Sequence, residues 1–203
     1  MDSMRNIIIK DVLSEDQIAD VYNRINQAPE ENSKIQARLG HKAFLIDLGE
    51  DLRKHLESIV QKEFGSEWTL NAIQFARYSK KYGYEPKLYP HFDDAFSTHK
   101  LTLDVQVKST IEWPIVVEGK EFLLHDNEAV VFYGTDQIHW RTPVELSEDD
   151  VVDMIFCHCD MINDPRGPIT PEHTQAMLKR EKEWGDKINI SREELTVNND
   201  NGK

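Results

Sequence analysis

The chain has 203 residues, enough for one domain with a sizeable core, and its hydrophobic content of 39% fits a soluble globular protein. No stretch approaches the roughly 18 consecutive apolar residues of a membrane helix. The formal net charge of −13 repels phosphate backbones and disfavours non-specific nucleic-acid binding. The first residues do not resemble a signal peptide, so we expect a cytoplasmic protein.

Two helical patterns occupy the first third of the chain. Residues 14–27 begin with Ser14 and Gln17 at capping-box spacing, and their apolar residues recur at i, i+3, i+4 and i+7. Residues 50–65 repeat this pattern and end at a glycine, a common helix stop. A short strand is predicted between them, within residues 42–48. We expect both helices to support a sheet and to carry no chemistry.

From about residue 68 to residue 160 the hydrophobic pattern changes to period two. Residues 100–108 alternate most regularly, with Leu101, Leu103, Val105 and Val107 on one face. Further strands are predicted at 70–79, 128–133 and 151–159, with a hairpin in 113–124. Many short strands that follow the helices, without alternating with them, predict a β-sandwich or barrel in an α+β protein.

Residues 163–168, "NDPRGP", interrupt the strand pattern. After them, Thr170 and Pro171 read as the N-cap and first position of a helix that runs to about Trp184. We expect Met177 and Trp184 to pack this helix against the domain. The last residues, 197–203, have a composition typical of disorder.

The two cysteines, Cys157 and Cys159, lie on the last predicted strand. Residues at i and i+2 of a strand share a face, so His158 between them points the other way. The pair is therefore predicted to be two buried thiols and not a metal site or a disulfide framework.

The segment "LYPHFDDAF" carries the first candidate metal ligands, His91 and Asp93. On an extended chain their side chains project to one side, with Cα atoms about 6.5 Å apart. His139, just after the predicted strand 128–133, is the best third ligand. Two histidines and one carboxylate with open positions form the facial triad of non-haem Fe(II) oxygenases. Asp94 is the rival carboxylate, but at i+3 it points away from His91.

The alternative is a polar turn and an unrelated histidine. His158 with Asp160 forms a second His-x-Asp triplet, for which the only later histidine, His173, is a poor partner. The other histidines lie in helical, linking or turn regions or open a strand without a carboxylate two residues on: His41, His55, His99 and His125.

Residues 71–160 resemble the double-stranded β-helix, a jelly-roll or cupin-like fold, of the Fe(II)/2-oxoglutarate-dependent oxygenases, especially the prolyl-4-hydroxylase-like branch. The resemblance rests on "FARYSKKYGYEPKLYPHFD", "LTLDVQV", "EWPIVVEGKEFLLHDNEAVVFYGTDQIHWR" and "VDMIFCHCD". It implies that His91, Asp93 and His139 bind Fe(II). It also implies that O2 and the cosubstrate 2-oxoglutarate drive a hydroxylation, with no catalytic side chain beyond the metal ligands.

The sequence departs from this family at the cosubstrate site. Relatives commonly have an Arg or Lys about ten residues after the distal histidine, where this chain has "LSEDDVVDM". Arg141 is the nearest substitute, because a guanidinium two residues after His139 could hold a carboxylate with two hydrogen bonds. Pairing of Arg141 with Asp136 or Glu145 is an equal alternative. Lys100 and Lys108 are weaker candidates.

Two further residues match cosubstrate positions of the family. Tyr78 resembles a tyrosine whose hydroxyl reaches 2-oxoglutarate, and Gln106 lies on the polar face of its strand, where relatives place a tyrosine or lysine. The alternatives are a half-buried core tyrosine and a polar residue on a solvated face.

The resemblance implies one oxygenase domain in residues 1–165, with helical support in 1–66 and the β-helix core in 67–162. Residues 166–203 would form the C-terminal helix and tail. In the family the substrate lies against the loops before the His-x-Asp strand, here within 36–44 and 79–87. The substrate could be a protein side chain, an amino acid or a small metabolite. Two other readings stay open: a cupin-like metal-binding jelly roll with other chemistry or only a binding role, and a non-catalytic interaction protein.

Overall fold

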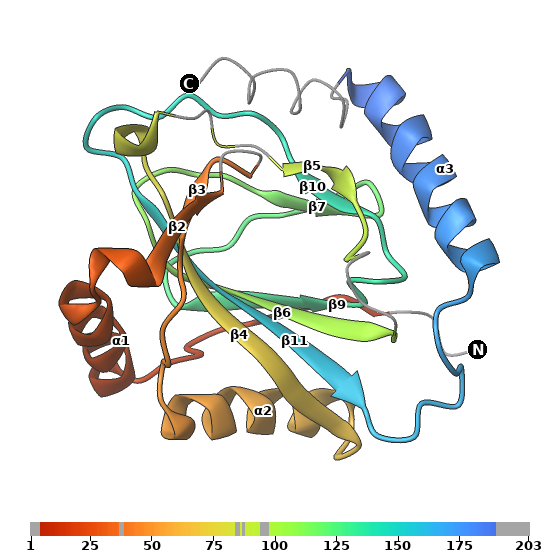
Figure 1. Ribbon diagram of the computed structural model, residues 1–203, viewed down its shortest axis with the longest axis horizontal. Helices are drawn as coiled ribbons and strands as arrows, with labels where there is room; N and C mark the ends of the chain where they lie inside the picture. Colours follow the sequence, from red (N-terminus) through yellow and green to blue (C-terminus); the bar gives the residue numbers. More distant parts are fainter. Residues whose placement is uncertain (1–4, 37–38, 84–85, 87, 94–97, 190–203) are drawn as a thin grey trace.

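The computed structural model describes residues 5–36, 39–83, 86, 88–93 and 98–189, which form two antiparallel sheets with helices on their outer faces (Figure 1). The larger sheet has the order β1 (Ile7–Ile9), β9 (Glu128–Phe132), β6 (Lys100–Ser109), β11 (Val152–Met161), β4 (Trp68–Tyr78), β3 (His41–Phe44) and β2 (Ser33–Gln36). The smaller sheet has the order β5 (Leu88–His91), β10 (His139–Arg141), β7 (Ile115–Val117) and β8 (Lys120–Phe122).

Between β4 and β11 the chain passes back and forth between the two sheets. It leaves the larger sheet after β4 for β5, returns in β6, crosses to the β7–β8 hairpin, returns in β9, crosses to β10 and ends in β11. This winding is a double-stranded β-helix. The α+β fold class and the jelly-roll core predicted from the sequence are confirmed.

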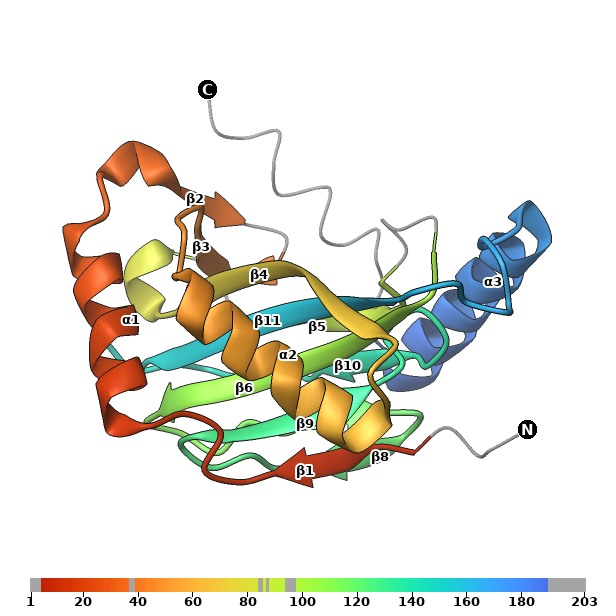
Figure 2. The ribbon, with the colours of Figure 1, turned by 90° about the horizontal axis from the view of Figure 1, so that it is seen from below.

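The outer face of the larger sheet carries the main apolar core. Alternation on β6 turns Leu101, Leu103 and Val105 toward this face, where each is fully buried. The helices α1 (Glu15–Gln27) and α2 (Glu50–Phe64) supply the opposing apolar side chains, and Figure 2 shows α2 lying across the sheet. The predicted capping box at Ser14 is present, and Gly65 ends α2. The two cysteines face the same core as free thiols, as predicted.

The inner face of the same strand is polar and also buried. Thr102, Asp104 and Gln106 are each 5% exposed or less, although alternation with apolar residues is equally typical of a strand with one solvated face. The smaller sheet covers them. Buried polar side chains between two sheets need partners, so this inner face is where a site is to be sought.

The helix α3 (Pro171–Ile188) packs on the outer side of the smaller sheet (Figures 1 and 2). Thr170 caps it and Met177 is buried, as predicted, while the Trp184 ring lies 4.8 Å from that of Trp140 on β10. The helix continues four residues past Trp184. The helix packs directly on the sheet, and the predicted end of the oxygenase domain at residue 165 remains a prediction. The predicted tail, 197–203, lies outside the described residues.

Other elements differ from the sequence prediction. The strand expected within 42–48 is β3, which begins one residue earlier and ends at Phe44. The edge strands β1 and β2 have three and four residues and are too short to show a period-two pattern in the sequence. Two short 3-10 helices, Glu30–Asn32 and Lys80–Tyr82, lie in connections. Within the described part of the chain, no helix is long and apolar enough to cross a bilayer.

Candidate metal centre

Strand pairing brings the three predicted metal ligands together. His91 ends β5 and lies directly opposite His139, the first residue of β10, in the antiparallel register. Asp93 follows β5, and its backbone N–H donates to the carbonyl of Gly134 over 2.9 Å. The Asp93 Oδ1 atom lies 3.9 Å from His91 Nε2 and 3.6 Å from His139 Nε2. One ligand atom of each residue lies within 4.8 Å of the other two, so the three can converge on one ion.

Backbone carbonyls fix the tautomers of both histidines. His91 Nδ1 lies 2.9 Å from the carbonyl oxygen of Tyr89, and His139 Nδ1 lies 3.0 Å from that of Gln137. A carbonyl can only accept a hydrogen bond, so each Nδ1 must carry the proton and donate it. The second nitrogen of each ring, Nε2, faces Asp93 and has a lone pair for a metal whenever the ring is neutral, the arrangement that metal-ligating histidines adopt.

A hydroxyl and a glycine shape the place of the carboxylate. Thr102 Oγ1 donates to Asp93 Oδ2 over 2.6 Å, which leaves Oδ1 facing the two imidazoles. A Cβ on Gly134 would lie 1.8 Å from Asp93 Oδ2 and 2.1 Å from Thr102 Oγ1, so no larger residue fits there. Gly134, in the sequence "YGTD", is a positioning residue that the sequence patterns did not reveal.

The protonation states also suit a cation. Burial raises the pKa of the Asp93 carboxyl, but the charges of His139, His158 and His91 outweigh this and hold the pKa well below its ordinary value. Burial and the charge of His139 lower the pKa of His91 to about 3. Burial opposes a proton on His139, but the Asp93 charge prevails and raises its pKa. An ion at this point would therefore replace the proton of His139.

A cavity of about 340 Å³ opens beside the three ligands, within the usual volume range of small-molecule sites. The predicted cosubstrate residue Tyr78 lines it, together with Thr102, Asp104 and His158. Gln106 lies elsewhere: its side-chain amide donates to the Leu124 carbonyl over 2.8 Å and it borders a different cavity. Asp104, two residues earlier on the same face, stands where Gln106 was expected.

Arg141 is buried, and its charge interacts with those of Tyr78 and Asp104, two residues that line this cavity. Its Nη1 donates to the carbonyl of Trp113, its guanidinium carbon lies 4.9 Å from the Trp113 ring, and its Nη2 has no hydrogen-bond partner among the described residues. Among the described residues neither alternative pairing, with Asp136 or with Glu145, is found, and Asp136 contacts His99 and Arg166 instead. An unpaired donor on a buried guanidinium is costly unless an acceptor meets it, and a carboxylate is the natural acceptor.

Asp104 is an acid within the electrostatic reach of that guanidinium. Burial raises the pKa of its carboxyl to about 7, although the charges of His139 and Arg141 act in the opposite direction. The inner face thus holds one buried cation and one carboxyl that keeps its proton to a higher pH than an ordinary aspartic acid. Sequence alternation placed Asp104 on this face but gave no sign of its role.

Two histidines near the cavity had no role predicted from the sequence. His158 Nδ1 lies 3.6 Å from Asp93 Oδ2, which puts the second His-x-Asp triplet beside the first. His41 is buried against the edge of the Tyr78 ring, and neither of its ring nitrogens has a hydrogen-bond partner among the residues described. Burial lowers its pKa to about 4, so the ring is neutral. Only the folded sheet brings these side chains to the cavity.

The remaining predicted candidates lie apart from the metal ligands. Lys100 is buried and pairs with Asp160, whereas Lys108 is exposed near the far end of β6. Asp94 lies outside the described residues. Gln36, Leu39 and His41 line the cavity, which places the described part of the segment 36–44 at its wall, while most of 79–87 borders other cavities.

Solved structures similar to this chain include 2-oxoglutarate–Fe(II) oxygenases. HygX from Streptomyces hygroscopicus, with nickel and 2-oxoglutarate bound, aligns over 79% of this chain and 84% of its own, with a TM-score of 0.59 and 8% identity. A 2OG-Fe(II) oxygenase family oxidoreductase from Burkholderia pseudomallei covers 78% and 86%, with a TM-score of 0.59 and 11% identity. A Pseudomonas putida prolyl-4-hydroxylase covers 78% and 94%, with a TM-score of 0.53 and 13% identity.

No protein-family model and no curated protein matches the sequence. At 8 to 13% identity the structural similarity concerns the fold. The similarity confirms, for the fold, the resemblance on which the sequence prediction rests. A prolyl-4-hydroxylase is among the similar structures, as the predicted branch of the family requires.

Proposed function

We propose that this protein is a non-haem Fe(II) dioxygenase that couples the oxidative decarboxylation of 2-oxoglutarate to hydroxylation of a substrate. The observation that carries the proposal is the convergence of His91, Asp93 and His139 beside a cavity, with both Nε2 atoms directed at one carboxylate oxygen. The fold supports it, since similar structures hold nickel and 2-oxoglutarate or Fe3+ and alpha-ketoglutarate.

The donor set fits Fe(II). Two neutral imidazoles and one carboxylate, with positions left open on the cavity side, are the ligands of a facial triad, whereas a closed zinc site usually has four protein ligands. The hydrogen bonds at both Nδ1 atoms and at Asp93 Oδ2 hold these ligands in place before any ion binds.

The cosubstrate fits less simply. Arg141 supplies a buried positive charge with an unpaired donor on the same strand as His139, which suits the distal carboxylate of 2-oxoglutarate. Tyr78 lies between this region and the cavity, its ring 4.9 Å from that of Trp113. We propose that both residues hold the cosubstrate, with Asp104 in its protonated form. Gln106 borders a different cavity and donates one amide N–H to the Leu124 carbonyl, so we leave its predicted contact with 2-oxoglutarate out of this proposal.

When bound, iron and 2-oxoglutarate supply the activation of O2 coupled to release of carbon dioxide and succinate. The protein positions and shields this chemistry. His91, Asp93 and His139 hold the ion, Thr102 and Gly134 fix the carboxylate, and the apolar walls exclude water.

The cavity supports a small polar substrate or a single side chain of a peptide. Beyond the metal ligands its wall includes the polar residues Gln36, Gln74 and His158 as well as Ile73 and Phe156. A volume of about 340 Å³ leaves little room beyond the cosubstrate and one such group. A cytoplasmic location remains the expectation drawn from the sequence.

The test uses metal-free protein under anaerobic conditions. Addition of Fe(II) and 2-oxoglutarate should give the weak visible charge-transfer band of the chelate, and admission of O2 should yield succinate. The Asp93→Ala variant is the matched negative control. Asp126 lies at the separate cavity that Gln106 borders, so the Asp126→Ala variant should behave as wild type. Iron binding without the band and without succinate would refute the cosubstrate assignment.

A second candidate is a metal-binding jelly roll with other chemistry. Asp104 favours it, because an acid with a pKa of about 7 beside Arg141 opposes a second carboxylate whenever it is ionised. In the same experiment this candidate predicts Fe(II) binding that depends on Asp93, with no effect of 2-oxoglutarate.

A further inference from the structure

A second His–Asp–His cluster lies outside the metal centre. His99 immediately precedes β6, Asp136 lies in the connection from β9 to β10, and His173 is in the first turn of α3. One ligand atom from each lies within 4.8 Å of the other two. The segment before β6, the β9–β10 connection and α3 therefore meet at one point.

The imidazoles have nitrogen atoms available for an ion. His99 Nδ1 lies 2.9 Å from Asp136 Oδ1, and the two side chains are each only 7% exposed. Among the described residues the ring of His173 makes no hydrogen bond, and it meets the His99 ring edge to face with centroids 5.3 Å apart. Ligands of a tetrahedral zinc ion lie about 3.3 Å apart at bonds of about 2.0–2.1 Å, so small side-chain shifts close the site.

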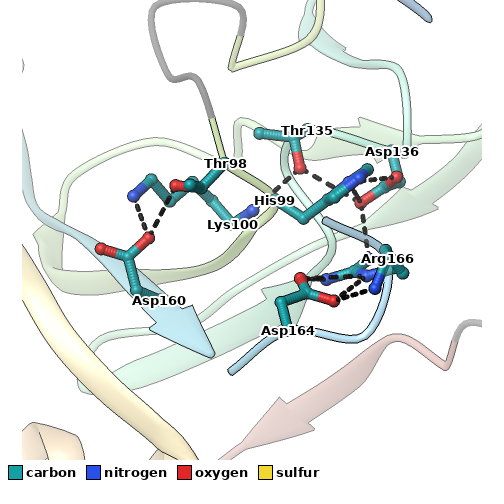
Figure 3. Close-up of polar contacts among 8 residues, drawn as sticks. All are labelled: Thr98, His99, Lys100, Thr135, Asp136, Asp160, Asp164 and Arg166. Carbon is teal, nitrogen blue, oxygen red and sulfur yellow. Dashed lines mark hydrogen bonds and ion pairs between the residues drawn. The ribbon is translucent and has the colours of Figure 1, made fainter. Parts of the chain in front are cut away.

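The carboxylate is held by outer partners, as Figure 3 shows. Asp136 Oδ2 accepts hydrogen bonds from Thr135 Oγ1 and from Arg166 Nη1, each over 3.1 Å. His99 Nδ1 lies 3.1 Å from the same Oδ2 and 2.9 Å from Oδ1, so Oδ1 is the oxygen without an outer partner among the described residues. Thr135 is itself fixed by the backbone N–H of Lys100 at 2.9 Å. Such second contacts to a ligating carboxylate are a usual feature of metal sites.

The nearby cation does not exclude a metal. Arg166 is paired mainly with Asp164, whose two oxygens accept from its Nε and Nη2 over 2.7 to 3.1 Å. The two carboxylates and one guanidinium leave a net charge of −1 around two imidazoles. A divalent ion that replaces the proton between His99 and Asp136 is therefore met by an excess of negative charge.

We propose that His99, Asp136 and His173 form a second site for a divalent metal of the zinc type, which fastens the first turn of α3 to the barrel. Two imidazoles and a carboxylate are ligands that zinc takes, with water in the fourth position. The site also bears on the first one. Glu181 of α3 accepts the backbone N–H of Phe92, the residue between the ligands His91 and Asp93, over 3.1 Å.

The test measures zinc stoichiometry in tag-free, metal-stripped protein by equilibrium dialysis and metal analysis. The wild type should bind two ions per chain and Asp93→Ala, which removes the first site, should bind one. Adding His173→Ala to Asp93→Ala should abolish binding, whereas adding His125→Ala, which changes a histidine in an exposed turn, should not. In the wild-type background His173→Ala should reduce two ions to one, which keeps the test valid if Asp93→Ala folds poorly.

Thermal unfolding gives an independent reading. Zinc should raise the Tm of Asp93→Ala and leave that of the Asp93→Ala/His173→Ala double variant unchanged, because only a native-state site stabilises. A folded Asp93→Ala protein that binds no zinc, or a double variant that still binds one ion, would overturn the proposal. Neither result depends on turnover of 2-oxoglutarate, so the proposal can fail without the proposed function failing.

Discussion

The two His–Asp–His clusters use the same side chains but differ in what surrounds them. In the metal centre each Nδ1 proton goes to a backbone carbonyl, and Asp93 lies 3.6 to 3.9 Å from the Nε2 atoms, too far for hydrogen bonds. In the second cluster, formed by His99, Asp136 and His173 and called the α3 cluster below, His99 Nδ1 lies 2.9 Å from the Asp136 carboxylate. The first cluster faces a cavity and has open ligand positions, whereas the second joins three segments. Surroundings, and not residue types, thus separate a site suited to chemistry from one suited to fastening.

The largest expected effect contrasts the two aspartates. Asp93→Ala should lower succinate formation at least about 1000-fold, beyond the roughly 10- to 100-fold cost of losing an outer-shell partner, because it removes a proposed iron ligand. Asp136→Ala should keep most of the activity and lower the Tm instead. Both are measured with Fe(II) in excess. Equal losses of activity in the two variants would contradict the distinction.

Asp104→Asn probes the buried carboxyl of the metal centre in metal-free protein. The folded-state pKa of about 7 lies above the ordinary value of 3.8. Native protein therefore keeps a proton that the unfolded chain loses, and the wild-type free energy of unfolding falls between about pH 4 and pH 7 and then levels off.

The asparagine variant lacks this loss. In urea unfolding, the free energy of unfolding of the variant relative to that of the wild type should rise across that pH range, by at most about 4 kcal/mol. Other groups titrate in both proteins and cancel in the difference. Parallel stability curves for the two proteins would show that Asp104 is not held protonated.

Arg141→Gln tests whether the buried guanidinium meets the cosubstrate. Loss of a charged hydrogen-bond pair costs about 1.5–3 kcal/mol, so the KM for 2-oxoglutarate should rise about 10- to 100-fold while the affinity for Fe(II) is kept. Arg166→Gln, at the α3 cluster, is the matched control and should leave this KM unchanged. If both variants behave as wild type, another group holds the cosubstrate.

The smallest effect concerns the link between the two clusters. Glu181→Ala leaves the buried N–H of Phe92 without its acceptor, which should lower the free energy of unfolding by about 1–2 kcal/mol and weaken Fe(II) binding several-fold. The exposed Glu183→Ala on the same helix should change stability by less than about 0.5 kcal/mol. An unchanged affinity for Fe(II) in Glu181→Ala would mean that α3 does not support the metal centre.

The sequence by itself determined the features that depend on local periodicity. Alternation on residues 100–108 assigned each side chain of β6 to a face, and capping residues located α1 and α3 within a few positions. The His-x-Asp spacing and the later His139 identified three side chains that do converge, because strand geometry and an ordered set of strands constrain them strongly.

Only the tertiary structure decided which polar residues of the inner face share a cavity. Asp104 and not Gln106 lines the cavity beside the metal centre, because Gln106 is bonded to Leu124 at a different cavity. Gly134 is required only because Asp93 and Thr102 fold against it. His99, Asp136 and His173 are far apart in sequence and meet only when α3 docks. Contacts of this kind depend on how sheets and helices pack, which no local pattern of residues encodes.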